Sequence, residues 1–262
     1  MEREYVINKS LNNNVILAFD KEKGQEVVLI GKGIGFNKKE GYIAKLREKD
    51  IEKSFLAFDN KEKEEYYQLI NQVDDKIIGI SEEIIVMAEK EFGALNSHIH
   101  IALTDHISFA IDRIEQGLEM NNPFIFEAKA LYPDEFNMGK KAAIMIKEEL
   151  GINIPESEIG FIALHIHAAR QCKKVGQTIK DTQFLMDLIN IVEEELLVKI
   201  DNSELIYNRL INHLRASINR MEEHKYIKNP LLDRIKEEFA ESYETSLKIG
   251  DYIVENKNIY IS

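Results

Sequence analysis

The sequence predicts a multidomain protein, with a small N-terminal antiparallel β-sheet domain followed by two all-α helical-bundle repeats. Two observations lead to this prediction. Short β-branched runs separated by turn residues occupy residues 1–57, and helical periodicity begins soon afterwards. One offset of 107 residues then aligns residues 103–152 with residues 210–259 without a gap. We therefore expect helical modules at 64–171 and 172–262.

The N-terminal domain contains three strand candidates, which lie at 14–20, 25–31 and 51–58. The first two are expected to form a hairpin, because both are apolar and Gly24 between them can adopt the positive φ of a tight turn. We expect four strands in all. A sheet of this size buries too little apolar surface to be stable alone, so we also expect a symmetric homodimer.

The helical part begins with amphipathic segments that have recognisable ends. In "NSHIHIALTDHISFAIDRIEQG" apolar residues recur at helical spacing from Leu103 to Ile114, and Gly117 follows as a C-terminal cap. Two further helices are expected to begin at Pro133 and Pro155, since proline is well tolerated in the first turn of a helix.

The internal repeat duplicates a histidine. His106 corresponds to His213 at the 107-residue offset, and four neighbouring positions are also identical. A lone histidine on a helix is usually a hydrogen-bonded core residue, but a duplicated one indicates a shared role. Pro155 corresponds to Ser262, so we expect the second module to lack its last helix.

The net charge of −12 is unevenly distributed. Residues 1–55 contain 11 Lys and Arg against 9 Asp and Glu, a charge of +2, whereas the remainder contains 23 against 37, a charge of −14. A polyanion is therefore expected to meet the N-terminal domain. The N-terminus lacks the apolar core of a secretory signal and no apolar run is long enough to span a membrane, so we expect a cytoplasmic protein without membrane insertion.

Five histidines fall in the segments "HIHIALTDH" and "HIH". A metal site is the obvious alternative, but residues two apart on a helix point about 200° apart and cannot both reach one ion. Cys172, the only cysteine, cannot complete a cysteine-based zinc site. We expect no metal and no other cofactor, which disfavours a histidine-metal hydrolase. His106 and His165 remain, each alone on its helix face.

The segment "GKGIGF" follows a predicted strand, as in dinucleotide-binding loops, but polar residues follow it where such a fold requires an apolar helix. Its glycines instead allow a ligand to approach the backbone, while Lys32 can contact a phosphate and Phe36 can stack on a base. The amide side chains of "NNN" (12–14) can read base edges. Taken singly, each feature also has an ordinary structural explanation, because asparagine runs usually form turns and a lone phenylalanine usually lies in the core.

Five strings of this sequence resemble the BglG-type transcriptional antiterminators, and they extend along the whole chain. They are "LNNNVILA", "VVLIGKGIGF", "HIHIALTDHISFAIDRIEQG", "NPFIFEAKALYPDEF" and "EIGFIALHIHAA". Together they are most similar to the subgroup that controls a glucose permease operon. The resemblance implies a sheet domain that dimerises and binds a hairpin in the leader mRNA, which keeps the overlapping transcription terminator from forming.

The resemblance also implies which residues act. The implied RNA contacts are Asn14, Gly31, Lys32 and Phe36, with Lys9 and Asn12 on the same surface. The implied phosphorylation sites are His106 and His165 in the first module and His213 in the second. The implied phosphoryl donors are the phosphocarrier protein HPr and the phosphotransferase domain of the sugar permease.

The resemblance thus implies a sugar-responsive regulator and not an enzyme. Without sugar, a phosphoryl group on His106 or His165 adds roughly −1.5 to −2 charge at a helix surface and is expected to inactivate the dimer. Two alternatives are a helical dimerisation adaptor that binds no RNA, and a DNA-binding transcription activator with the same modules. The activator would need a helix-turn-helix, whereas the N-terminus predicts strands.

Overall fold

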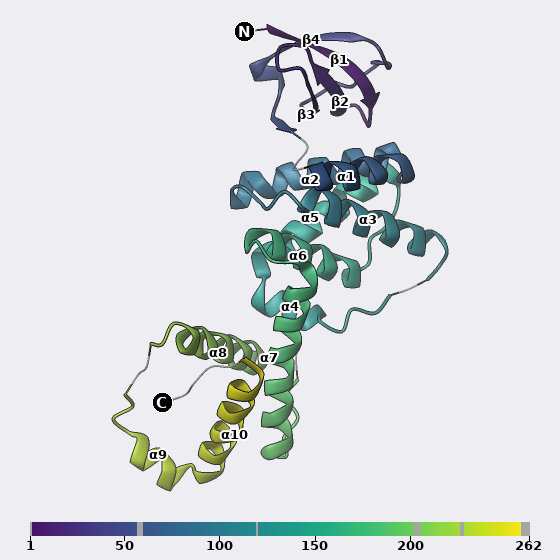
Figure 1. Cartoon of the computed structure of the whole chain (residues 1–262). Coiled ribbons are helices and arrows are strands. Elements are labelled where there is room, and N and C mark those ends of the chain that lie inside the picture. Colours follow the sequence, from purple (N-terminus) through teal and green to yellow (C-terminus); the bar gives the residue numbers. More distant parts are fainter. Residues whose placement is uncertain (1, 57–59, 119, 202–204, 226–227, 258–262) are drawn as a thin grey trace. The chain divides into compact units, whose positions relative to one another are not determined.

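The computed structural model describes residues 2–56, 60–118, 120–201, 205–225 and 228–257 (Figure 1). These residues form two compact units. The first contains the sheet and most of the first helical module, namely residues 1–122 and 134–175. The second contains residues 123–133 and 176–262.

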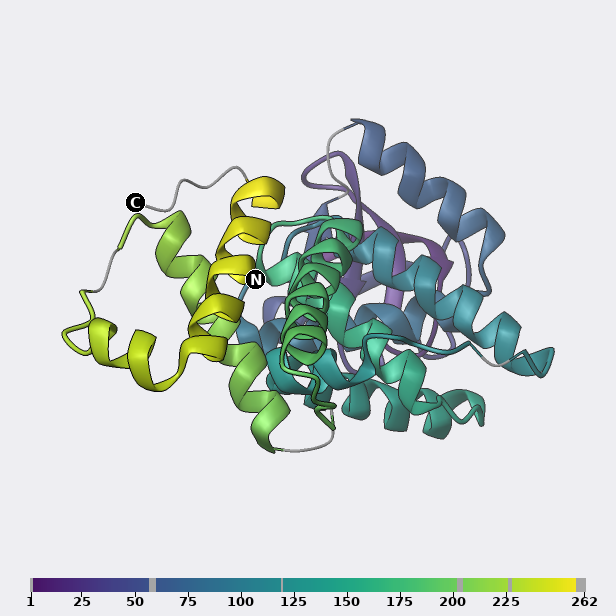
Figure 2. The same cartoon turned by 90° about the horizontal axis from the view of Figure 1, so that it is seen from below.

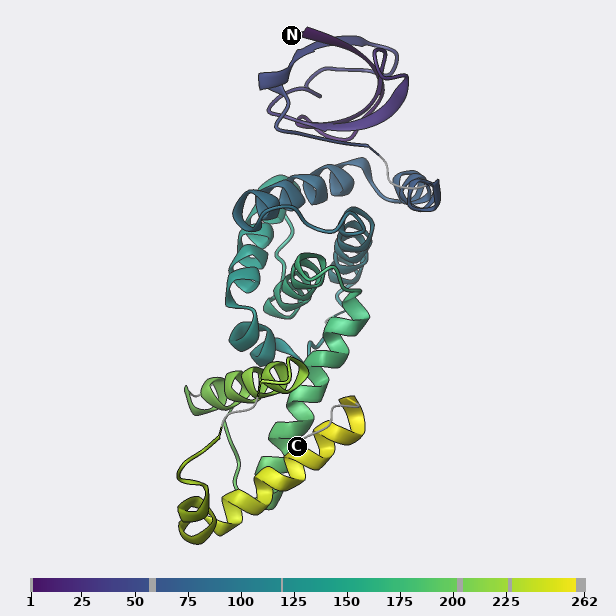
Figure 3. The ribbon, with the colours of Figure 1, turned by 60° about the vertical axis from the view of Figure 1, so that its left-hand side comes forward.

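The N-terminal sheet is antiparallel and has five strands among the described residues, one more than expected. They are β1 (Glu2–Ser10), β2 (Val15–Asp20), β3 (Gln25–Ile30), β4 (Ile43–Arg47) and β5 (Lys53–Leu56), in the spatial order β4-β1-β2-β3-β5. The sheet curls strongly (Figure 3). The predicted β2–β3 hairpin is present, and Gly24 adopts a φ of 66° while its N–H donates to the carbonyl of Asp20 at 2.8 Å.

Both faces of the sheet are covered within the first unit. One face forms a core of its own that includes Ile7, Ile16 and Leu29. The other face, with Leu11, Val15, Leu17, Val28 and Ile30, packs against Tyr66, Ile70, Ile78 and Val86 of the first two helices. Burial on both faces explains why β2 and β3 are continuous apolar runs and do not alternate with polar residues.

The helices of the first unit share one core. They are α1 (Asn60–Gln72), α2 (Asp75–Phe92), α3 (Ile99–Glu115), α5 (Pro133–Leu150) and α6 (Glu156–Arg170). Apolar side chains of α2, α3, α5 and α6 meet in this core. The predicted spacing on α3 is confirmed, because Leu103, Ile107 and Ile111 are buried, and Gly117 follows the helix with a φ of 69°.

All the regular elements among the described residues of the second unit are helices. It contains α4 (Ile125–Leu131), α7 (Val175–Glu195), α8 (Leu205–Glu222), α9 (Leu232–Glu238) and α10 (Ala240–Lys257) (Figure 2). The bounds of α9 and α10 are those of α4 and α5 displaced by 107 residues, so the sequence repeat is a repeat of helices. The expected fold class, a sheet domain followed by helical repeats, is confirmed.

Helix α4 packs against α8 within the second unit. The Asn212 side chain donates to the carbonyl of Ala130 at 3.3 Å, and Arg215 donates to that of Leu131 at 2.8 Å. Tyr207 donates to the buried carboxylate of Glu127. Among the described residues, no helix is long and apolar enough to cross a membrane.

Candidate functional site

The glycine-rich loop at 31–36 is held in place by the asparagines that precede β2. The N–H of Gly33 donates to the side-chain oxygen of Asn14 at 2.9 Å, and the N–H of Gly31 donates to its carbonyl at 2.9 Å. A Cβ at Gly31 would lie 2.1 Å from the carbonyl oxygen of Asp50, and one at Gly35 would lie 2.2 Å from that of Asn12. These two glycines therefore permit close packing of the loop on its own domain.

Two side chains of this loop face solvent. Phe36 is 59% exposed and Lys32 is also exposed. On a loop that is fixed by hydrogen bonds, an exposed aromatic ring can stack on an unpaired base and an exposed cation can contact a phosphate. The structure thus leaves Lys32 and Phe36 open to a ligand, whereas Gly31 is buried.

The other predicted RNA contacts meet acidic side chains of α2. Nδ2 of Asn12 donates to Glu83 Oε1 at 2.7 Å, and Nδ2 of Asn14 donates to Glu83 Oε2 at 3.0 Å. Nζ of Lys9 lies 2.6 Å from a carboxylate oxygen of Asp75. Three of the six predicted RNA contacts are therefore engaged by α2, which nothing in the sequence indicated.

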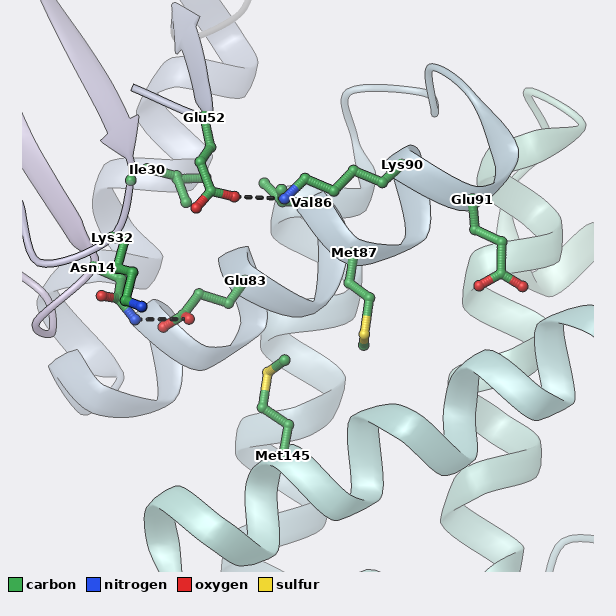
Figure 4. Close-up of a pocket in the computed structure, with 11 residues that line it drawn as sticks. Asn14, Ile30, Lys32, Glu52, Glu83, Val86, Met87, Lys90, Glu91 and Met145 are labelled. Atoms are coloured by element: carbon green, nitrogen blue, oxygen red, sulfur yellow. Dashed lines mark hydrogen bonds and ion pairs between the residues drawn. The ribbon is translucent and has the colours of Figure 1, made fainter. Parts of the chain in front are cut away.

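A helical glycine makes room for this contact. A Cβ at Gly79 of α2 would lie 2.5 Å from Nδ2 of Asn12 and 2.9 Å from its Cβ, so any other residue there would push Asn12 away. Beside the contact is an open cavity of about 720 Å³, lined in part by Asn14, Lys32 and Glu83 (Figure 4). Met87 and Met145 reach toward this cavity from α2 and α5 (Figure 4).

The predicted phosphorylation sites of the first module lie together. The rings of His106 on α3 and His165 on α6 stack with centroids 4.7 Å apart and planes inclined by 30°. The sequence separates these histidines by 59 positions, and their contact follows from the packing of α3 against α6. His165 also lines an open cavity of about 740 Å³ with His98 and Asp105.

A buried carboxylate supports His106. Oε2 of Glu158 lies 3.2 Å from Nε2 of His106, and its Oε1 accepts a hydrogen bond from Arg113 at 2.9 Å. Burial alone would raise the pKa of Glu158, but His106 and Arg113 together lower it below its ordinary value. Sequence reasoning missed Glu158, since an acid in the first turn of a helix usually only favours the helix dipole.

His165 has a different environment. Burial, with smaller contributions from His106 and His98, lowers its pKa well below the ordinary value of 6.5, so the ring is neutral at pH 7. Its Nδ1 is buried without a hydrogen-bond partner within the described part of the chain. For Asp105, burial raises the pKa and the charge of His106 partly opposes this.

Two other histidines of the first module, His100 and His167, are held by separate carboxylates. Nδ1 of His100 lies 2.6 Å from Glu82, whose other oxygen accepts from Tyr66 at 2.8 Å. Nδ1 of His167 lies 2.8 Å from Glu135. No group of three His, Cys, Asp or Glu side chains among the described residues is arranged to hold a metal ion.

His213, the predicted site in the second module, is exposed on α8. Its neighbours Asn212 and Arg215 hold the C-terminal end of α4. The structure therefore brings His106 and His165 together, and it places His213 in the other unit with a different set of neighbours.

Comparisons with known proteins agree with this architecture. Residues 5–64 match the CAT RNA binding domain, and residues 82–169 and 186–262 match the PRD domain. The chain is thus an RNA-binding sheet domain joined to two copies of a helical regulatory domain.

Relatives along the whole chain define the family further. Transcription antiterminator LicT of Bacillus subtilis is 37% identical over 252 residues, which are 94% of this chain and 90% of LicT. The PtsGHI operon antiterminator of the same organism is 40% identical, over 95% of this chain and 89% of its own length. The crystal structure of GlcT CAT-PRDI matches with a TM-score of 0.53 and 46% identity, over 63% of this chain and 98% of the other. This chain belongs to the transcriptional antiterminators that combine CAT and PRD domains, and it is similar to the glucose-operon subgroup.

Proposed function

We propose that the protein binds a hairpin in its own leader mRNA and thereby prevents a transcription terminator from forming, in response to a sugar. The observation that carries this proposal is the loop at 31–36, where Lys32 and Phe36 face solvent on a domain of the RNA-binding class. Gly31 and Asn14 shape this loop, and Lys9 and Asn12 extend the surface toward α2.

The response to sugar is assigned to phosphorylation of His106, His165 and His213. A neutral imidazole can attack a phosphoryl donor, and the first two rings are adjacent in the structure. The donors are HPr and the phosphotransferase domain of the sugar permease. While sugar is transported the permease loses its phosphoryl groups, so the first module remains unphosphorylated and the protein active.

The active form is assigned as a homodimer. Phe109 lies one turn after His106 on α3 and is 57% exposed, which gives the surface beside His106 an apolar character. Phosphorylation of His106 in both copies would place like charges near such an interface and oppose association.

In this role the protein is a regulator and not an enzyme, and it acts in the cytoplasm, where the transcript emerges. We assign the functional domains by the sequence repeat. The RNA-binding domain comprises residues 1–57, and the two regulatory modules comprise residues 64–171 and 172–262.

The test is an RNA mobility shift with the protein's own leader, using unphosphorylated and phosphorylated protein. Only the unphosphorylated form is expected to shift the RNA. A His106→Ala/His165→Ala variant should take no label in the first module and should allow antitermination without sugar. Absence of a shift with unphosphorylated protein would refute the RNA function, and persistent label in residues 64–171 of the variant would refute the histidine assignment.

A further inference from the structure

Three carboxylates hold histidine rings in the first unit, and all are at least nine-tenths buried. Glu82 faces His100, Glu135 faces His167 and Glu158 faces His106. In the first two pairs the carboxylate meets Nδ1 of the ring, at 2.6 Å and 2.8 Å. In the third it meets Nε2, at 3.2 Å. The carboxylate therefore faces Nε2 in His106, whereas it faces Nδ1 in His100 and His167.

This difference determines which nitrogen of His106 can react. A neutral imidazole has one N–H and one lone pair, and a carboxylate favours the N–H on the nitrogen that it faces. For His106 the proton is therefore favoured on Nε2 and the lone pair on Nδ1. Nε2 is buried against Glu158, so the exposed 14% of the side chain belongs to other atoms of the residue. No hydrogen bond to Nδ1 occurs within the described part of the chain.

We infer that Glu158, held by Arg113, is a positioning residue that directs phosphoryl transfer to Nδ1 of His106. This inference rests on the proposed phosphorylation of His106. The Nδ1 lone pair attacks the phosphorus atom, and a new N–P bond forms. The bond between phosphorus and the donor breaks, and its electron pair returns to the donor. Nε2 keeps its proton throughout, so the product ring carries a positive charge.

The position of Glu158 suits this product. A cationic ring 3.2 Å from a carboxylate is stabilised more than a neutral one, and the effect is strong because Glu158 is only 2% exposed. The contact is not aligned as a full hydrogen bond in the uncharged state, which leaves room for it to tighten when the ring gains charge. Arg113 engages the other oxygen and keeps the carboxylate oriented.

His165 lacks this support. No ion pair of His165 occurs within the described residues, and its Nδ1 is buried without a partner. Reaction at its Nε2 would require the proton to sit on Nδ1, where no acceptor receives it. His106 is therefore the faster acceptor of the two stacked rings.

The first test identifies the phosphorylated nitrogen. The full chain with His165→Ala and His213→Ala, labelled with ¹⁵N-histidine, is phosphorylated with phosphoenolpyruvate, the general phosphotransferase enzymes and the permease domain. Two-dimensional ¹H–¹⁵N spectra distinguish the two phosphohistidines, and we expect phosphate on Nδ1 of His106. Phosphate on Nε2 would overturn this inference and leave the proposed function intact. If wild-type protein takes no phosphate on any histidine, the proposed response to sugar fails and this inference falls with it, whereas the proposed RNA binding is tested separately by the mobility shift.

The second test concerns Glu158 itself, with Glu135→Gln as the matched control. Both carboxylates are buried and both contact one histidine and one arginine. Glu158→Gln should slow labelling of His106 by roughly tenfold or more, because an amide can donate to Nε2, which shifts the ring proton to Nδ1 and removes the lone pair that attacks. The ¹H–¹⁵N spectra of the unphosphorylated variant should show this change of tautomer, and Glu135→Gln should change neither the rate nor the tautomer of His106.

A milder variant covers the case in which Glu158→Gln does not fold. Arg113→Lys keeps the charge but loses the fork of the guanidinium, so Glu158 is oriented less firmly, labelling should slow by a smaller factor and part of the ring should change tautomer. If the folded variants label His106 as fast as the wild type and keep its tautomer, Glu158 has no positioning role.

Discussion

In the loop at 31–36, the glycines and the exposed side chains such as Phe36 have different roles. The sequence suggested that the glycines of "GKGIGF" let a ligand approach the backbone. In the structure Gly31 and Gly35 instead let the loop pack against the carbonyls of Asp50 and Asn12. The exposed side chains that remain for a ligand are those of Lys32 and Phe36. Recognition by this loop is therefore expected to depend on side chains.

Phe36→Ala should weaken binding of the leader hairpin by roughly tenfold or more, since stacking of one base on an aromatic ring contributes about 1–3 kcal/mol. The thermal midpoint should hardly change, because the side chain is 59% exposed. Phe19→Ala is the control, as Phe19 is 37% exposed near the opposite end of β2 and should not affect RNA affinity. A mobility-shift titration measures both, and equal affinities would contradict the assigned contact.

His165 gives a prediction about pH. Its folded-state pKa is well below 6.5, so below pH 6.5 the unfolded chain binds a proton that the folded protein does not. The free energy of unfolding should therefore fall as the pH drops, by at most about 1.4 kcal/mol per pH unit from this group. The nearby titratable groups include His106, His98 and Asp105.

Urea unfolding at pH 7.5 and pH 5.5 checks this prediction. His165→Gln removes the titrating group, so its free energy of unfolding should depend less on pH than that of the wild type. Parallel pH profiles would show that His165 is protonated equally well in the folded and unfolded states.

At the scale of elements, the sequence predicted best what depends on local pattern. Helix α3 and the β2–β3 hairpin were predicted because their periodicity and turn residues lie within a short window. Strands β1 and β4 were not located, since their apolar residues are few and separated by charges. The contact of Asn12 with Glu83 could not be predicted from the sequence, because it joins positions 71 apart and no local sequence pattern indicates it.

The contact between α2 and the sheet should compete with RNA. Gly79→Ala should displace Asn12 from Glu83 and free it for the hairpin, while alanine favours the helix by about 1 kcal/mol over glycine. Gly79→Ala and Glu83→Ala should each raise the RNA affinity by roughly three- to tenfold, the effect of about 1 kcal/mol.

Glu91→Ala is the matched control for charge. Glu91 also lies on α2, but it pairs with Lys141. Its removal changes the net charge as Glu83→Ala does and should leave RNA affinity nearly unchanged at moderate salt. If all three variants bind RNA with the same affinity, then either Asn12 and Asn14 do not contact RNA, or breaking their hydrogen bonds to Glu83 costs negligible free energy.

At the scale of the whole molecule, burial is unequal between the units. Helices α2, α3 and α6 bury many side chains, whereas α9 has no buried residue and α10 has only Thr245 and Ile253 among the described positions. Helices with few buried contacts open more often. In this 262-residue chain, amides of α9 and α10 should exchange at least roughly tenfold faster than those of α2 and α3. Hydrogen exchange read by mass spectrometry tests this, and similar rates would contradict it.

Helix α4 belongs by sequence to the first repeat and by its contacts to the second unit. The chain therefore passes between the units three times, after residues 122, 133 and 175. A fragment that stops at residue 171 would keep α4, where Ala128 and Leu131 are buried in the full chain, but would lose α8, against which α4 packs, and should therefore expose apolar surface of α4. Such a fragment is expected to self-associate through this apolar surface. Conversely, residues 176–257 produced alone should fold better when a peptide spanning residues 123–133 is added in trans.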